Sequence, residues 1–260
     1  GTMDSVGIVV PAYDPDVGRL RAYLTALRQT LDPDELHVEL DAGGPGVADR
    51  IRDAGATVAE SDSRRGKGAA ITAGFEKLET DVLAFADADG ATPADSFAEV
   101  VSQVTDGSAD LAVGSRRHPD ADVQSHQTVV RRLLGDGFAW LAGNLLTVDL
   151  YDYQCGAKAI TAGAWERVRG HLYESGFAWD VELVAVAGAL GCRVAEVPIS
   201  WEDQPGSTVS AVRTPVRLLG SLLRARHRAK RLGDSRLHAA IADRREGEPA
   251  LVEETTTEHE

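Results

Sequence analysis

Two aspartates separated by a single residue, Asp87 and Asp89, directly follow the most apolar strand-like run of the chain. Carboxylate oxygens at this spacing can share one Mg²⁺ or Mn²⁺ ion, and an ion that also holds a diphosphate stabilises it as a leaving group. The same Asp-x-Asp pattern arises by chance in an acidic chain and often caps a helix. The pair therefore predicts either a metal-diphosphate site or a helix cap.

A glycine-rich turn with the sequence SRRGKGAA occupies residues 63–70, just ahead of a predicted helix. Glycines let a backbone approach a ligand closely, and the start of a helix attracts phosphate. The turn is not a Walker loop, because its glycines are too close together and neither Ser nor Thr follows Lys67. A capped turn without a ligand is the alternative.

Two further segments mix aromatic residues with acids where a plain core would be aliphatic: residues 151–158 (YDYQCGAK) and 177–183 (FAWDVEL). Aromatic rings can form a platform for a sugar face, and carboxylates accept hydrogen bonds from sugar hydroxyl groups. In the alternative interpretation Trp179 belongs to the core, and Asp180 caps a helix that begins at Val181.

The elements that must position these residues alternate along the chain. Apolar runs predict strands at 6–10, 36–40, 57–59, 81–86, 111–113 and 194–201, and helical periodicity predicts helices at 20–31, 47–54, 66–78, 93–104, 129–146, 181–190 and 214–232. This alternation predicts an α/β fold with a doubly wound, mainly parallel sheet and helices on both faces. Ligands of such sheets bind beyond the carboxyl ends of the strands, where Asp87 and Asp89 are expected.

The chain has 260 residues, 43% of them hydrophobic, and a formal net charge of -14. Its basic residues are nearly all arginine, with lysine only at positions 67, 77, 158 and 230, which suggests a salt-adapted cytosol, as in a halophilic archaeon. This acidity argues against a nucleic-acid partner. We expect a cytoplasmic protein, since the N-terminal residues lack the basic and apolar regions of a signal peptide. No apolar run reaches the roughly 18 residues that span a bilayer, so any membrane contact is expected to be peripheral.

The C-terminal part divides into two regions. Residues 213–235 interleave arginines with leucines and valines, which predicts a basic amphipathic helix lying on a membrane surface. The alternative is a helix that packs its leucines on the rest of the fold. Residues 236–260 lose the periodic pattern and end in an acidic stretch, so we expect a disordered tail.

In their order along residues 6–210, these segments resemble the family 2 glycosyltransferases of the GT-A fold, and in particular the dolichyl-phosphate β-glucosyltransferases and polyprenyl-phosphate mannose synthases. The motifs that carry the resemblance are VVPAY at 9–13, RGKG at 65–68, DADGAT at 87–92, GSR at 114–116, QCG at 154–156 with Lys158, WDVEL at 179–183, and EVP at 196–198 through Trp201 to GS at 206–207. The resemblance implies a GT-A catalytic domain over residues 4–212. The DADGAT and QCG forms favour the glucosyl branch.

The resemblance also implies roles for individual residues. Those implied in donor binding are Pro11, Ala12, Tyr13 and Asp41 around the nucleoside, with Asp41 at the base edge, Lys67 at the diphosphate, Asp87 at the ribose and metal, and Asp89 at the metal. Those implied in the transfer, besides Asp89, are Arg116 and Arg131 at the acceptor phosphate, and Asp180 and Glu182 near the sugar.

The implied activity is inverting transfer of a hexose, glucose before mannose, from UDP-glucose or GDP-mannose to dolichyl or polyprenyl phosphate. Such a reaction serves protein N-glycosylation or cell-surface glycan synthesis, on the cytoplasmic face of the membrane. A lipid phosphate is already an anion, so it attacks without a general base. Two alternatives stay open: a family 2 enzyme acting on a soluble or glycan hydroxyl, which needs a carboxylate base, and a non-catalytic nucleotide-sugar-binding module. The latter is suggested by YDP at 13–15 and DAGG at 41–44, where the family usually has YNE and DDGS.

Overall fold

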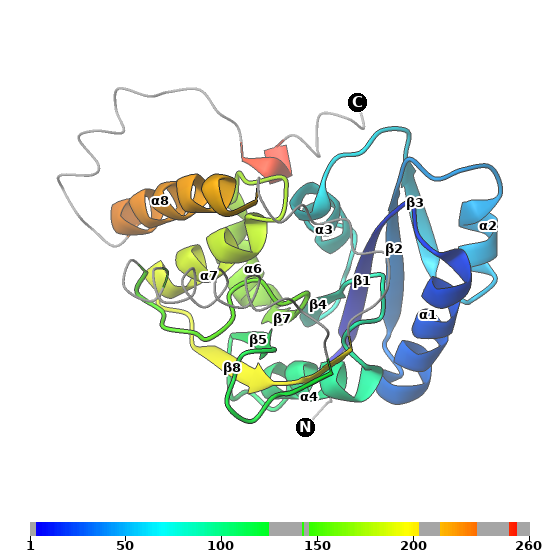
Figure 1. Ribbon diagram of the computed structural model, residues 1–260, viewed down its shortest axis with the longest axis horizontal. Helices are drawn as coiled ribbons and strands as arrows, with labels where there is room; N and C mark the ends of the chain where they lie inside the picture. Colours follow the sequence, from blue (N-terminus) through cyan, green and yellow to red (C-terminus); the bar gives the residue numbers. More distant parts are fainter. Residues whose placement is uncertain (1–3, 125–141, 143–145, 203–213, 233–249, 254–260) are drawn as a thin grey trace.

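Strands and helices alternate along the computed structural model (Figure 1), which describes residues 4–124, 142, 146–202, 214–232 and 250–253. The strands are β1 (Val6–Tyr13), β2 (Glu35–Asp41), β3 (Thr57–Ser61), β4 (Val82–Ala86), β5 (Leu111–Ser115), β6 (Asp122–Gln124), β7 (Ala157–Thr161), β8 (Val194–Pro198) and β9 (Ser200–Glu202). The helices are α1 (Val17–Leu31), α2 (Val47–Arg52), α3 (Lys67–Phe75), α4 (Ala94–Thr105), α6 (Ala162–Val168), the 3₁₀ turn η1 (Arg169–His171), α7 (Trp179–Ala189) and α8 (Thr214–Leu232).

The main sheet contains seven strands in the order β3-β2-β1-β4-β7-β5-β8. Its neighbouring strands are parallel except at β7, which runs antiparallel to both β4 and β5. The predicted α/β fold with a mainly parallel sheet is confirmed. Strand β7 was not predicted, because its sequence AKAIT is short and carries a lysine at its second position. That lysine, Lys158, pairs in register with Phe85 at the end of β4.

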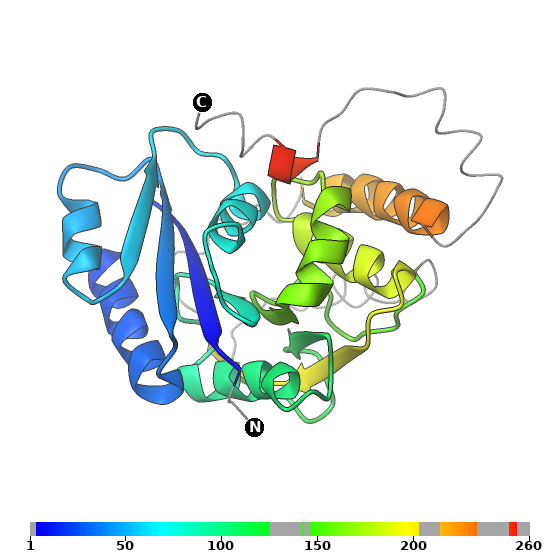
Figure 2. The same ribbon diagram turned by 180° about the vertical axis from the view of Figure 1, so that it is seen from behind.

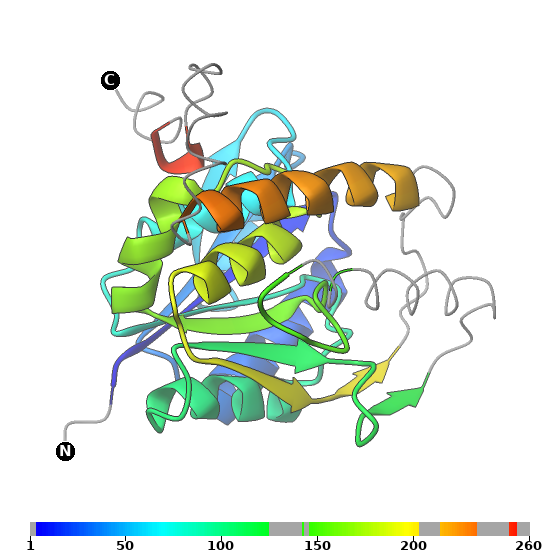
Figure 3. The ribbon, with the colours of Figure 1, turned by 90° about the vertical axis from the view of Figure 1, so that its left-hand side faces the viewer.

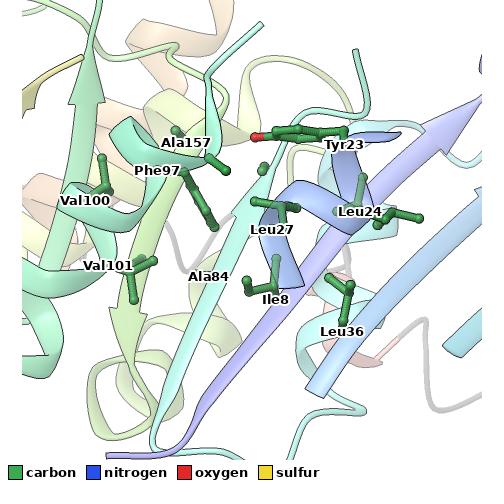
Figure 4. Close-up of a cluster of buried hydrophobic side chains, with 14 of the residues drawn as sticks. Ile8, Tyr23, Leu24, Leu27, Leu36, Ala84, Phe97, Val100, Val101 and Ala157 are labelled. Carbon is green, nitrogen blue, oxygen red and sulfur yellow. The ribbon is translucent and has the colours of Figure 1, made fainter. Parts of the chain in front are cut away.

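Helices cover both faces of the sheet, as predicted (Figures 1 and 2). Alternate residues of β1 point to opposite faces, as the pleat requires. Ile8 and Val10 pack with α1, α2 and α4 in one core, part of which Figure 4 shows, while Val9 packs with α3, α6 and α7 in the other. Strand β4 is buried over its whole length, which explains its continuous apolar run.

Several element boundaries differ from the predicted ones for local reasons. Helix α1 begins at Val17, because the Asp16 carboxylate caps it by accepting a hydrogen bond from the backbone N–H of Arg19 at 3.0 Å. The predicted strand at 194–201 is divided into β8 and β9, and β9 leaves the main sheet to pair with β6. Of the helix predicted at 129–146, only Ala142 and Leu146 belong to the described residues.

Helix α8 lies along α7 on the outside of the fold (Figure 3). Leu222, Ala225 and Ala229 are buried against the domain, whereas Leu223 is half-exposed. Packing on the fold therefore accounts for one face of this helix. None of the helices in the described ranges combines the length and the apolar content needed to cross a membrane.

A short helical turn at residues 250–253 departs from the expectation of a disordered tail. Ala250 and Leu251 are buried, and the backbone N–H of Leu251 donates to the carbonyl of Leu172 at 3.0 Å. The contact needs only two apolar residues. The average composition of an acidic stretch does not reveal so small a docking site.

Candidate active site

A cleft of about 630 Å³ opens at the carboxyl ends of β1, β2 and β4. This is the edge at which open α/β sheets bind ligands. The expected site residues that line it are Pro11, Ala12, Tyr13, Asp41, Lys67, Asp87, Asp89 and Arg116. Asp180 and Glu182 do not line the cleft, and Arg131 lies outside the described residues.

The Asp87–Asp89 turn is held by contacts on both sides. The backbone N–H of Asp87 donates to the carbonyl of Gly156 at 3.0 Å. A Cβ at Gly156 would lie 1.8 Å from the Asp87 Oδ2 atom, so the carboxylate rests directly on this glycine. From α1, the Tyr23 hydroxyl donates to the carbonyl of Thr92 at 2.6 Å (Figure 4 shows Tyr23). Neighbouring elements thus fix where the two carboxylates point.

The two carboxylates fit a divalent cation. Burial and the nearby negative charge of Asp87 raise the pKa of Asp89, and a bound cation would relieve that repulsion. No cluster of three or more His, Cys, Asp or Glu side chains suited to a metal occurs in the described part of the chain. An ion at this pair would therefore take its remaining ligands from a diphosphate and water, as Mg²⁺ commonly does.

Lys67 connects the cleft to a buried chain of charges. Its Nζ atom lies 3.0 Å from Asp87 Oδ1 and 3.1 Å from Asp180 Oδ2. The other oxygen of Asp180 contacts Lys158 Nζ at 2.6 Å, and this ammonium also donates to the Cys155 carbonyl at 2.7 Å. Burial opposes the charge on Lys67, but Asp180 and Asp87 outweigh it and raise the pKa of the lysine. The ammonium is therefore a fixed positive charge beside the Asp87–Asp89 turn.

Asp180, which was expected near the sugar, does not line the cleft. Asp180 is 1% exposed, and the two lysines occupy both of its oxygens. Although burial opposes ionisation, Lys158 and Lys67 lower the pKa of Asp180, so it remains a carboxylate. It does not cap its helix either, since α7 begins at Trp179.

Glu182 also departs from its expected role. It is fully buried, and its Oε2 atom accepts the backbone N–H groups of Tyr173 and Glu174, each at 2.8 Å. Its Oε1 atom pairs with Arg228 of α8. The carboxylate therefore holds a loop and a helix together.

Trp179 belongs to the core, as one of the two interpretations predicted. It is fully buried, and the centre of its ring lies 5.6 Å from the ring centre of Phe85 and 6.4 Å from that of Phe75. These edge-on contacts join α7, β4 and α3. A sugar platform at Trp179 is excluded, because the ring is covered by protein.

Arg116 presents a cation at the other side of the cleft. Its guanidinium makes a two-pronged pair with the buried Asp152, with Nε–Oδ2 and Nη2–Oδ1 distances of 2.7 and 3.0 Å. Although burial opposes ionisation, Arg116 lowers the pKa of Asp152 to about 2. The backbone N–H of Asp152 is in turn held by Glu196 at 2.9 Å. Arg116 is thus rigid, charged and a lining residue of the cleft.

The end of the cleft beside β2 contains a second ion network. Asp41 accepts from the backbone N–H and the Nε of Arg65 at 2.7 and 2.8 Å. Arg65 also contacts the fully buried Glu39 at 2.8 Å, and Lys77 reaches the same carboxylate at 2.6 Å. Asp41 lines the cleft, but these bonds make it an anchor for the 62–66 loop. Arg64 of the same loop places its guanidinium 4.2 Å from the centre of the Tyr13 ring.

The glycines of the RGKG motif pack against protein. A Cβ at Gly66, whose φ is +104°, would lie 2.5 Å from the Ser175 carbonyl oxygen, and one at Gly68 would lie 2.5 Å from that of Glu174. The backbone N–H of Ala69 already donates to the Ser175 carbonyl at 3.1 Å. The glycines therefore allow the start of α3 to meet the 174–176 backbone, and Lys67 is the charged residue of this motif that lines the cleft.

Some structural residues of the site received no role from the sequence. Lys158 and Asp152 lay in a segment that the sequence singled out, but their partners come from α7 and from the residue that follows β5. Glu39 lies on β2, whose sequence ELHVELD alternates polar and apolar residues, so no local signal marked this carboxylate as buried. A buried charge in a strand calls for a partner, yet local sequence does not name it.

A cleft at the carboxyl edge of a mainly parallel sheet, with an Asp-x-Asp pair and a lysine inside it, is the arrangement of the GT-A fold of glycosyltransferases. The chain belongs to glycosyl transferase family 2, whose pattern matches residues 7–145.

Individual relatives agree with this assignment. The chain is 32% identical over 231 residues to glycosyltransferase AglD of Haloferax volcanii, covering 84% of this chain and 36% of the relative. It is 34% identical over 152 residues to dolichyl-phosphate beta-glucosyltransferase of Mus musculus, covering 55% of this chain and 46% of the relative. The chain thus spans between about a third and a half of the length of the curated relatives it matches.

A solved structure has the same fold. Glucosyl-3-phosphoglycerate synthase from Mycobacterium tuberculosis, in complex with Mn²⁺, UDP-glucose and phosphoglyceric acid, superposes with a TM-score of 0.65. The identity is 16%, and the match covers 86% of this chain and 80% of that chain. At this identity the likeness shows the fold.

Proposed function

We propose that this chain is an inverting glycosyltransferase that moves a hexose, with glucose favoured over mannose, from a nucleoside diphosphate to dolichyl or polyprenyl phosphate. The observation that carries the proposal is the convergence of Asp87, Asp89 and Lys67 with Arg116 in one cleft. Similarity to dolichyl-phosphate beta-glucosyltransferases supports glucose as the sugar and a lipid phosphate as the acceptor. Protein N-glycosylation and cell-surface glycan synthesis are the processes that use such products.

The residues divide the work of the transfer between them. Asp87 and Asp89 would hold Mg²⁺ or Mn²⁺, which when bound neutralises charge on the departing diphosphate. Lys67, held by Asp87 and Asp180, adds a second positive charge at that place. Arg116, fixed by Asp152, attracts the anionic acceptor from the other side. This separation of charges suits in-line displacement with inversion at the anomeric carbon.

The state of Asp180 supports a phosphate acceptor over a hydroxyl acceptor. A hydroxyl must lose its proton to a base, whereas a phosphate is already ionised. Asp180, the acid we had expected near the sugar, is buried between two lysines and cannot reach an acceptor in this arrangement. A reaction that does not use Asp180 as a general base fits the cleft better.

Helix α8 supports peripheral contact with the cytoplasmic face of a membrane. Besides its packed face, it exposes Leu223, Lys230 and Arg231 to solvent. Leucine and basic side chains together suit an anionic headgroup layer. An acceptor with a long apolar chain is found only in a membrane, so such contact would bring the cleft to its substrate.

The test is direct synthesis of the glycolipid. Purified protein is incubated with radiolabelled UDP-glucose or GDP-mannose, Mn²⁺ and dolichyl phosphate in vesicles, and the organic extract is counted. We expect labelled lipid with UDP-glucose above GDP-mannose, and none with Asp89→Asn. Transfer to a soluble or glycan hydroxyl instead would support the second acceptor class. Metal-dependent nucleotide binding without any transfer would overturn the proposal in favour of a non-catalytic binding module.

A further inference from the structure

The segment of residues 172–177, which connects η1 to α7, reaches the cleft at its last residue. Phe177 at its end lines the cleft and is 48% exposed. The backbone of this segment also abuts the start of α3, where Lys67 lies. Its position therefore bears on the space that a nucleotide donor would occupy.

Glu182 and α8 hold the 172–177 segment from the outside. The Glu182 carboxylate accepts the backbone N–H groups of Tyr173 and Glu174 at 2.8 Å each. Arg228 of α8 pairs with the same carboxylate, and its guanidinium lies 4.2 Å from the centre of the Tyr173 ring. One turn earlier, Arg224 pairs with the Glu174 side chain at 2.9 Å.

The turn at residues 250–253 holds the same segment at its beginning. The Leu251 N–H donates to the Leu172 carbonyl, and Leu251 and Leu172 are both buried in one apolar cluster. Elements that lie far apart in the sequence, α8 and this turn, therefore meet on a single stretch of six residues. In Figure 1 the turn lies between α8 and α3.

On its inner side the segment contacts α3 without room to move independently. The Ser175 carbonyl accepts the N–H of Ala69, and Gly66 and Gly68 touch the carbonyl oxygens of Ser175 and Glu174 so closely that neither site has room for a Cβ. A shift of the segment would therefore shift the start of α3. That in turn would move Lys67 relative to Asp87, 3.0 Å away.

We propose that Glu182 and Arg228 are positioning residues for the donor site: through the 172–177 segment, α8 sets the place of Phe177 and Lys67 and thereby the affinity for the nucleotide. A buried carboxylate stays ionised and keeps its backbone partners only when a cation compensates it. Arg228 supplies that cation from a helix outside the cleft. The inference rests on the proposed function, since it concerns binding of a nucleoside diphosphate.

The experiment compares Arg228→Gln with Arg228→Lys, which keeps the charge, and with Arg50→Gln, which removes the same charge from the exposed side of α2 at the opposite edge of the fold. Binding of UDP and of GDP, each with Mn²⁺, is measured by calorimetry. Amide hydrogen exchange is followed at residues 172–177. Arg224→Gln is a milder second variant, because this arginine is more exposed.

We expect Arg228→Gln to weaken nucleotide binding by about fivefold or more, the usual lower bound for coupling between two sites. Exchange at the Tyr173 and Glu174 amides should rise while exchange in β1 and β4 stays slow. Arg228→Lys should restore most of the affinity, and Arg50→Gln should match the wild type. A role in stability alone predicts a lower melting temperature with unchanged affinity in the folded protein.

Three outcomes are decisive. Wild-type nucleotide affinity in Arg228→Gln and Arg224→Gln, with or without faster exchange in the segment, overturns the inference and leaves the proposed function intact. An equal loss of nucleotide affinity in Arg228→Lys and Arg228→Gln would show that the positive charge at this position is not responsible. This result also overturns the inference. Absence of UDP and GDP binding in the wild-type protein overturns the proposed function, and this inference with it.

Discussion

Replacing Gly156 with alanine should separate the folding of this protein from its binding of metal and nucleotide. The added carbon would lie 1.8 Å from Asp87 Oδ2 and 2.1 Å from its Cγ. Ordinary contacts between such atoms are longer by more than an ångström, so the carboxylate must rotate away. Rotation breaks the 3.0 Å pair with Lys67 and moves one of the two proposed metal ligands.

The two effects should differ in size. Inserting a methyl group into a packed site costs about 1–3 kcal/mol, and we expect the low end, because the Asp87 side chain is 40% exposed and can turn into the cleft. For a domain of this size, about 1 kcal/mol lowers the melting temperature by only roughly 2–4 °C. Disturbing the support of a metal ligand typically costs about 10- to 100-fold in affinity, so Mn²⁺-dependent binding of UDP should fall by that factor.

The assay pairs calorimetric titration of UDP and Mn²⁺ with a thermal melt of the same sample. Gly163→Ala is the matched control, because no atom lies within 4 Å of the position that its Cβ would take. This control should keep both the affinity and the melting temperature. Wild-type Mn²⁺–UDP affinity in Gly156→Ala would refute the reasoning, since Asp87 would then either not be held by Gly156 or not be a ligand.

Two more predictions concern buried charges, and a third concerns the proposed metal site. Lys158→Met should lower the free energy of unfolding, measured by urea titration, by about 3 kcal/mol. This is the low end for a broken buried ion pair, because Lys67 still contacts Asp180. Adding Asp180→Asn should recover part of the loss. Burial opposes ionisation of Glu39, but its hydrogen bonds to His37, Lys77 and Arg65 outweigh burial and lower its pKa from 4.5 to about 2. The ionised carboxylate therefore contributes roughly 3 kcal/mol to the free energy of unfolding. This contribution is present above pH 4.5 and is lost as the pH falls towards 2. Denaturation between pH 2 and 6 should show this slope in the wild type and a flatter one in Glu39→Gln. Excess chelator should stop sugar transfer and Mn²⁺ should restore it, whereas metal-independent transfer would contradict the role of Asp87 and Asp89.

The sequence by itself determined the alternation of strands and helices from β1 to β5 and the edge of the sheet that carries the cleft. This information is local. A central strand that is buried on both faces is commonly apolar throughout, as β4 is. Asp87 and Asp89 follow it immediately, so their place beyond its carboxyl end was set by chain connectivity alone.

Only the tertiary structure decided which of the charged residues face the cleft. Asp180 and Glu182 are two residues apart on α7, so their side chains project roughly 200° apart around the helix axis. They could share a site only if at least one of them lay outside the helix. A start at Val181 would have placed Asp180 there, whereas the helix begins at Trp179.

The antiparallel insertion of β7 was equally beyond the sequence. It brings Lys158 into contact with Asp180, while α8 brings Arg228 into contact with Glu182. Whether a carboxylate binds ligand or supports the fold depends on which cation the rest of the chain places beside it. The partners in these two ion pairs are 22 and 46 positions apart in the sequence. No local sequence pattern carries information over such a separation.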